Sequence, residues 1–136
     1  MATYNKFNQT VEDMANGVYN CATDQFTVAL TVAAPVATNT VLANLTEIAY
    51  TNLGGRNLTT ASSGQTSGTF TQLFSDLVLT ASGGPVAAFR YITIYDNTPT
   101  SPADPLLCFY DFGSSLVLAD GETLTIDFTT STFTLA

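Results

Sequence analysis

The sequence predicts a mainly β protein, an antiparallel β-sandwich or a jelly-roll-like barrel with a short N-terminal helix. Runs of alternating apolar and polar residues recur along the chain, Gly, Pro and Ser turns separate them, and no βαβ alternation is visible. With 136 residues, 46% hydrophobic and 10% charged, the chain is large enough to bury its own core. We expect an amphipathic helix or arm over 1–20 and a single β domain over 21–136.

The N-terminal segment has a helical period. Four apolar residues follow the spacing i, i+4, i+7, i+11 and would form one stripe: Phe7, Val11, Met14 and Val18. Asn5 or Asn8 is a candidate cap, Glu12 and Asp13 would lie on the outer side, and Gly17 weakens the helix end. The helix either packs on its own domain or is an arm that docks on a neighbouring subunit.

The period then changes to two, which is typical of strands. In residues 24–32, alternate residues from Phe26 to Val32 would face the core, and Thr27, Ala29 and Thr31 would face water. Residues 33–55 would form a long connection with one short helical turn or strand around 42–50. Further strands are expected at 56–61, 69–81 (with a bend near 75–76), 87–96, 106–112, 115–118, 123–130 and 131–135.

Two of these strands, 87–96 and 106–112, are apolar on both faces, so we expect them to be central and covered on both sides. The stretch between them, 97–105, contains Pro99 and Pro102 and predicts an exposed loop.

The stretch DGETLTIDF, at 120–128, concentrates acids in a chain that has few of them. Asp120-Gly121 lies between two apolar runs and predicts a hairpin that joins them, with Asp120 and Glu122 as turn acids in water. Leu124, Ile126 and Phe128 would point inward. The alternative is a calcium site built from separate loops by Asp96, Asp104, Asp111, Asp120 and Glu122, although no EF-hand spacing is present.

Several classes of function are disfavoured. Without histidine the chain lacks the commonest general base, and no GxxxxGK[ST] phosphate loop is present, so we expect no enzyme, cofactor or small-molecule substrate. A glycosidase with two carboxylates stays possible in principle, but the chain has no Trp for a sugar platform. A net charge of −8 with three cations argues against binding nucleic acid or a membrane surface.

The N-terminal residues do not have the apolar core of a signal peptide. We expect Cys21 and Cys108 to be reduced and buried rather than disulfide-bonded.

Segments in the same order along nearly the whole chain resemble a family of small virion structural proteins of tailed bacteriophages. They are MATYNKFNQTVEDMANGVYN, VALTVAAPVATNTVLANLTEIA, SSGQTSGTF, FRYITIYDN, PLLCFYDFGSSLVLADGETLTIDF and TFTLA. The resemblance implies a component of the particle, and we favour a capsid decoration (cement) protein on the outer head surface, made in the cytoplasm of the host bacterium. Its partners would be the major capsid protein and copies of itself, usually as a homotrimer.

The expected contact residues are Tyr4, Phe7, Val11 and Met14 in the N-terminal segment, with Pro99 and Pro102 in the loop 97–105 as a second set. The acidic composition suits the outside of a head better than a surface that lines packaged DNA. Two alternatives stay open. One is a tail or neck component (a tube, terminator or fibre-associated subunit), and the other is a host-surface module that binds carbohydrate or Ca²⁺.

Overall fold

The structure is a computed structural model that describes residues 2–129 and 131–136. It is mainly β with antiparallel strand pairing and one short α-helix near the N-terminus, which confirms the predicted fold class. The elements are β1 (Thr3–Lys6), α1 (Gln9–Ala15), β2 (Phe26–Thr31), the 3₁₀ helix η1 (Leu42–Asn44), β3 (Thr60–Thr66), β4 (Thr69–Phe74), β5 (Leu77–Thr80), β6 (Phe89–Asp96), β7 (Leu106–Leu116), β8 (Thr123–Ile126) and β9 (Phe133–Leu135).

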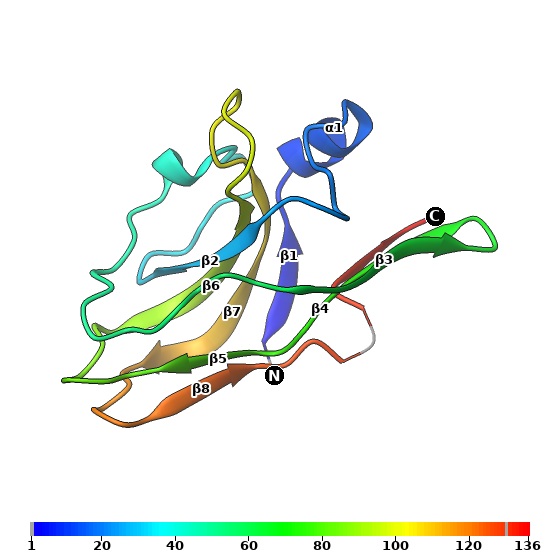
Figure 1. Ribbon diagram of the computed structural model, residues 1–136. Coiled ribbons are helices and arrows are strands. Elements are labelled where there is room, and N and C mark those ends of the chain that lie inside the picture. Colours follow the sequence, from blue (N-terminus) through cyan, green and yellow to red (C-terminus); the bar gives the residue numbers. More distant parts are fainter. Residues whose placement is uncertain (1, 130) are drawn as a thin grey trace.

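Three sheets form two layers (Figure 1). One layer is a four-stranded sheet in the order β1-β7-β6-β2. The other contains the three-stranded sheet β3-β4-β9 and the two-stranded sheet β5-β8. As the sequence predicts, the segment 69–81 bends, because β4 ends at Phe74 and β5 begins at Leu77 in a different sheet.

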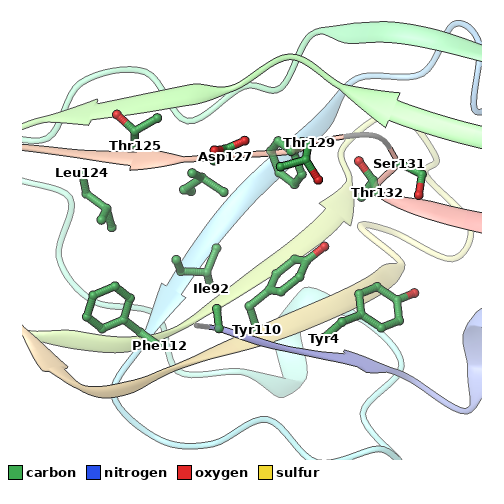
Figure 2. A pocket seen from close by; sticks show the side chains of 13 residues that line it. Tyr4, Ile92, Tyr110, Phe112, Leu124, Thr125, Asp127, Thr129, Ser131 and Thr132 are labelled. Atoms are coloured by element: carbon green, nitrogen blue, oxygen red, sulfur yellow. The ribbon is translucent and has the colours of Figure 1, made fainter.

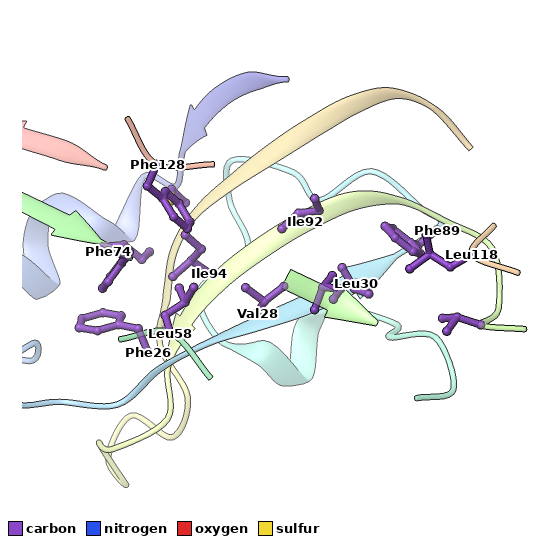
Figure 3. Packing of buried hydrophobic residues seen from close by; sticks show 14 of the residues in the cluster. Phe26, Val28, Leu30, Leu58, Phe74, Phe89, Ile92, Ile94, Leu118 and Phe128 are labelled. Carbon is purple, nitrogen blue, oxygen red and sulfur yellow. The ribbon is translucent and has the colours of Figure 1, made fainter. Parts of the chain in front are cut away.

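The main core lies between the layers (Figure 3). Phe26 of β2 contacts Phe74 of β4 with ring centroids 5.2 Å apart, and Phe74 meets Phe128 edge-on at 5.7 Å. Aliphatic residues of β2 and β6 extend this core along the sheet, where Val28 and Ile94 are both fully buried. Burying such side chains contributes about 1.5–3 kcal/mol each, so this seam holds the two layers together.

The expectation that β2 has one face in water is wrong, because all six of its residues are buried. Its second face lies under residues 32–50, and Ala29 packs there with Phe7, Tyr95 and Leu106. Val32, expected in the core, lies beyond the strand end and is 60% exposed. The central position of β6 and β7 is confirmed. Strand β6 is buried on both faces over 92–96, whereas β7 is buried only over 106–108 and is mostly exposed from Phe112 onwards.

The expected N-terminal helix is present but short: it covers seven residues, because Thr3–Lys6 before it form a strand. Its buried side chains are Thr10 and Asp13, whereas Val11 is 56% exposed. A hydrogen bond to the sheet explains this orientation: the Thr10 hydroxyl donates to the Leu107 carbonyl of β7 at 2.7 Å. The Asp13 carboxylate is buried on the same side, 3.5 Å from the Tyr19 hydroxyl. Asn8 holds the cap position without a side-chain cap bond.

The strand expected at 56–61 begins later, at Thr60, and runs to Thr66. It pairs with β4 in a hairpin whose turn places Ser67 and Gly68 at φ values of 52° and 85°. The two cysteines are free and buried, as expected.

The turn at Asp120-Gly121 is present, but the expected hairpin is not. The strands before and after the turn, β7 and β8, do not pair with each other. Strand β8 pairs with β5, in the register Leu79↔Leu124, and not with the residues before the turn. The reason is that β7 stays in the four-stranded sheet as far as Leu116, after which the chain crosses to the other layer. The inward orientation of Leu124, Ile126 and Phe128 is confirmed by their burial relative to their exposed neighbours.

Candidate protein interface

A cleft of about 430 Å³ opens between the two layers beside β1 (Figure 2). Tyr110 and Phe112 of β7 form one wall, and the opposite wall comes from β8 and the residues that follow it. Leu124 points across the gap towards Phe112, while the Thr125 side chain points the opposite way. The sandwich is therefore not closed on the β1 side, and apolar side chains are accessible there.

A second cleft, of about 320 Å³, lies between the N-terminal elements and β9. Met14 and Val11 of α1 line one side, and Phe133 and Leu135 of β9 line the other. Tyr4 lines both clefts, so the two hollows meet at this ring. We call the pair of clefts the β1 groove.

The β1 groove is bordered by two strand edges. Strand β1 is the last strand of its sheet, and β9 is the last strand of the three-stranded sheet. A terminal strand presents a row of backbone N–H and C=O groups without a ladder partner, which is a template for pairing with another chain. A groove between two such edges, with aromatic and aliphatic walls and with Thr and Ser side chains in its first cleft, has the features of a peptide-docking site.

The groove carries little charge. Lys6 is the charged residue that lines the second cleft, and Asp127 is the charged residue that lines the first. Burial raises the pKa of Tyr4 above its ordinary value, and nearby Cys108 adds to the effect. Burial likewise raises the pKa of Tyr110. Both phenols therefore stay neutral and can donate hydrogen bonds at any physiological pH.

The sequence-predicted contact residues fall into two groups. Tyr4, Val11 and Met14 all line the β1 groove. Phe7, in contrast, is fully buried in its own chain and packs on Phe109 with ring centroids 5.1 Å apart, so it anchors the segment. The role of these residues as contacts stays a prediction.

The loop 97–105 lies at the same end of the molecule as α1 (Figure 1). Pro99 is half-buried and Pro102 is exposed, following a cis peptide bond. The Thr10 hydroxyl donates to the Leu107 carbonyl just beyond this loop, so α1 is held against the strand that follows the loop. Pro99 and Pro102 do not line the β1 groove.

The acids that the sequence singled out have separate structural roles. Asp120 accepts the Gly83 N–H at 3.0 Å, and Glu122 accepts the Ala119 N–H at 2.8 Å, so both order their turn. Asp111 forms an ion pair with Arg90 at 2.8 Å. Across residues 2–129 and 131–136, no group of three or more acids or cysteines is placed to hold a metal ion.

Sequence reasoning missed the second wall of the groove, Phe133 and Leu135, and the exposed ring of Phe112. Leu135 is 54% exposed and Phe112 is 37% exposed. The sequence shows that Phe133 and Leu135 are apolar residues of a strand at the end of the chain. Such a pattern does not indicate which surface of the protein these side chains line.

A second feature also projects from the body. The β3–β4 hairpin extends beyond the sandwich (Figure 1), and residues 59–74 contain no charged side chain. Most of β3 is exposed. A neutral projecting hairpin can contact another protein at low desolvation cost.

Comparisons with known proteins give no relative: no family model, no curated protein and no solved structure matches the chain. Among the helices of the described residues, none has the length and apolar character needed to cross a membrane.

Proposed function

We propose that the protein is a structural subunit of a tailed-bacteriophage particle, and specifically a capsid decoration (cement) protein. It binds the outer head surface and joins neighbouring major capsid subunits. The observation that carries the proposal is the β1 groove, whose two clefts meet at Tyr4 between the edges of β1 and β9; the second cleft is mainly apolar and the first is mixed. The sequence resemblance to virion proteins supplies the biological setting.

The occupant of the groove is an extended, weakly charged segment of a capsid subunit. Such a segment adds to the edge of β1 through main-chain hydrogen bonds and places alternate side chains in the two clefts. Charge favours one orientation, with an acid of the partner near Lys6 and a base near Asp127. A second copy of this chain fits less well, because each copy has a net charge of −8.

Stabilisation of the head follows from mass action. A subunit that binds only the assembled lattice lowers the free energy of that lattice relative to its separated subunits. Many copies, each bridging two capsid subunits, multiply the effect because bridging is intramolecular once the first contact forms. The acidic exterior also keeps the protein away from DNA, since like charges repel.

Separation of particle parts tests this proposal. Heads and tails of the phage that encodes the protein are purified apart and probed by mass spectrometry. A cement protein is recovered with heads and is released before the major capsid protein as denaturant rises. Recovery with tails alone contradicts the proposal.

The projecting β3–β4 hairpin favours a second candidate, a tail or neck ring subunit. Ring subunits stack through extensions that reach the next ring, and this hairpin is neutral, with its strand β3 mostly exposed. In that case the protein is recovered with tails or with the neck, and shortening the hairpin at 64–69 blocks ring assembly while the fold is kept.

A further inference from the structure

Asp96, the last residue of β6, is a fully buried acid. Its Oδ1 accepts the Thr98 N–H at 3.0 Å. Its Oδ2 is also buried, and no donor within the described residues reaches it. An ionised carboxylate oxygen in this position would lack compensation for its lost hydration, which costs several kcal/mol in general.

The acid next to Asp96 is Asp24, because the residues that follow the two acids are hydrogen-bonded: the Asn97 N–H donates to the Gln25 carbonyl at 2.8 Å. The Asp24 carboxyl is close enough to contribute to the raised pKa of Asp96. A hydrogen bond between two carboxyl groups needs one proton, because two carboxylates have no hydrogen to share. The orphaned Oδ2 of Asp96 is explained if that oxygen carries the proton and donates it to Asp24. Burial first, and then Asp24, raise the pKa of Asp96 above the ordinary carboxyl range.

The other titratable groups around this pair bring no positive charge. Cys21 lies near both acids, and Tyr19 lies near Asp96 and near Asp13 of α1. The three cations of the chain are placed elsewhere: Arg56 pairs with Glu47, Arg90 pairs with Asp111, and Lys6 lines the β1 groove. Because no Lys or Arg side chain of the described residues is placed to neutralise Asp24 and Asp96, a bound proton is the positive charge that lets the two carboxyl groups lie side by side.

We propose that Asp24 and Asp96 share one proton, and that this proton closes a pH-sensitive latch between residues 19–25 and the end of β6. The assignment does not depend on the proposed virion role. Several hydrogen bonds join the same two segments: Gln25 N–H donates to Thr98 Oγ1 at 2.8 Å, and Asn97 N–H donates to the Gln25 carbonyl at 2.8 Å. Asp24 also accepts the Asn20 N–H at 2.7 Å, so its carboxylate orders the loop itself.

The latch connects to the β1 groove through its neighbour Tyr19. The Tyr19 hydroxyl donates to the Leu106 carbonyl at 2.6 Å and lies 3.5 Å from Asp13 of α1. Residues 19–25 are thus the link between α1, which lines the groove, and the core strand β2. Loss of the proton leaves two negative charges side by side at Asp24 and Asp96. Their repulsion weakens the attachment of residues 19–25 to the end of β6.

The direction of the pH effect follows from the raised pKa of Asp96. The folded state binds a proton that the unfolded chain releases at lower pH, so stability is fully present below the ordinary Asp pKa. It falls as pH rises through the pKa of Asp96 in the folded protein. Alkaline conditions, and not acid ones, open the latch.

Thermal unfolding between pH 5 and 8.5 tests the proposal with four proteins: wild type, Asp96→Asn, Asp24→Asn and the control Asp127→Asn. The wild-type Tm falls over this range by about 5 °C or more. Asp96→Asn flattens the profile, because its amide donates to Asp24 at every pH, and Asp24→Asn flattens it by donating to Asp96. Asp127 is exposed, so its variant removes the same charge and keeps the wild-type slope.

Parallel profiles for wild type and Asp96→Asn overturn the proposal, as does an equal flattening by Asp127→Asn, which would indicate general charge repulsion. NMR titration of ¹³C-labelled Asp carboxyls in the wild type gives a readout that needs no variant. An Asp96 signal that titrates at or below pH 4 refutes the shared proton. Millimolar Ca²⁺ that raises the Tm of the wild type at pH 8, but not that of Asp96→Asn, would identify the bound cation as a metal and also overturn it.

Discussion

The ring of Tyr4 on β1 packs edge-on against Tyr110 on β7, with centroids 5.7 Å apart and planes inclined by 68°. The two residues are direct partners in the antiparallel register. Tyr4 is nevertheless 42% exposed, because it stands where the two clefts of the β1 groove meet. A rigid aromatic ring that is held on one side and open on the other is a suitable anchor for a partner chain.

Replacing this ring should weaken binding to heads more than it weakens the fold. We expect Tyr4→Ala to lower affinity for undecorated heads by about tenfold or more, as for central aromatic residues of interfaces in general. Co-sedimentation with heads measures the affinity, and circular dichroism checks that the variant is folded.

The matched control is Val32→Ala, which truncates another exposed apolar residue that does not line the groove. It should bind like the wild type. Equal binding by Tyr4→Ala and the wild type would exclude the β1 groove as the contact surface.

Gly84 is expected to resist substitution. Its φ is 149°, and a Cβ there would lie 2.6 Å from Nδ2 of Asn52, which donates to the Pro85 carbonyl. Gly84→Ala must therefore displace Asn52 and strain the backbone, at a cost of about 1–3 kcal/mol in the free energy of unfolding. Urea denaturation measures the loss.

Gly64, in the exposed strand β3, is the control for that experiment. An added Cβ meets no atom within 4 Å there, so Gly64→Ala should change stability by less than about 0.5 kcal/mol. A similar loss for both variants would mean that Asn52 moves freely and that the turn at 82–85 is not constrained.

The two thiols should be unreactive in the folded protein. Burial raises the pKa of Cys21 to about 11 and that of Cys108 to about 12. At pH 8 the thiolate, which is the reactive form, then amounts to about one part in a thousand or less. We expect labelling by a thiol reagent to be slow in buffer and fast in guanidinium chloride. Rapid labelling of one cysteine in buffer would show that its surroundings open readily.

Local patterns in the sequence predicted much of the fold. The alternation of apolar residues in β6 and β7, the bend at 75–76 and the turn at Asp120-Gly121 all depend on neighbours in the chain, and all are present. The pairing of β8 with β5 was missed because a turn signal does not say which distant strand is the partner. Likewise, the burial of Ala29 depends on residues 32–50 folding over it.

In the N-terminal segment, the sequence pattern predicted the wrong buried side of the helix, for a different reason. Its helical spacing of apolar residues is real, but the hydrogen bond from the Thr10 hydroxyl to the Leu107 carbonyl of β7 determines which side of α1 faces the sheet. Tyr4 and Met14 were among the predicted contact residues, and both line the groove. The opposite wall, Phe133 and Leu135, comes from the other end of the chain, so only the tertiary structure brings it there.

Addition of the purified protein to emptied, undecorated heads, followed by electron microscopy, tests the central claim most directly. The account predicts new density at regular sites on the outer head surface, oriented so that β1, α1 and β9 face the capsid subunits. Heads that stay bare at saturating protein concentration, or density that contacts the capsid only through surfaces away from Tyr4, would contradict it.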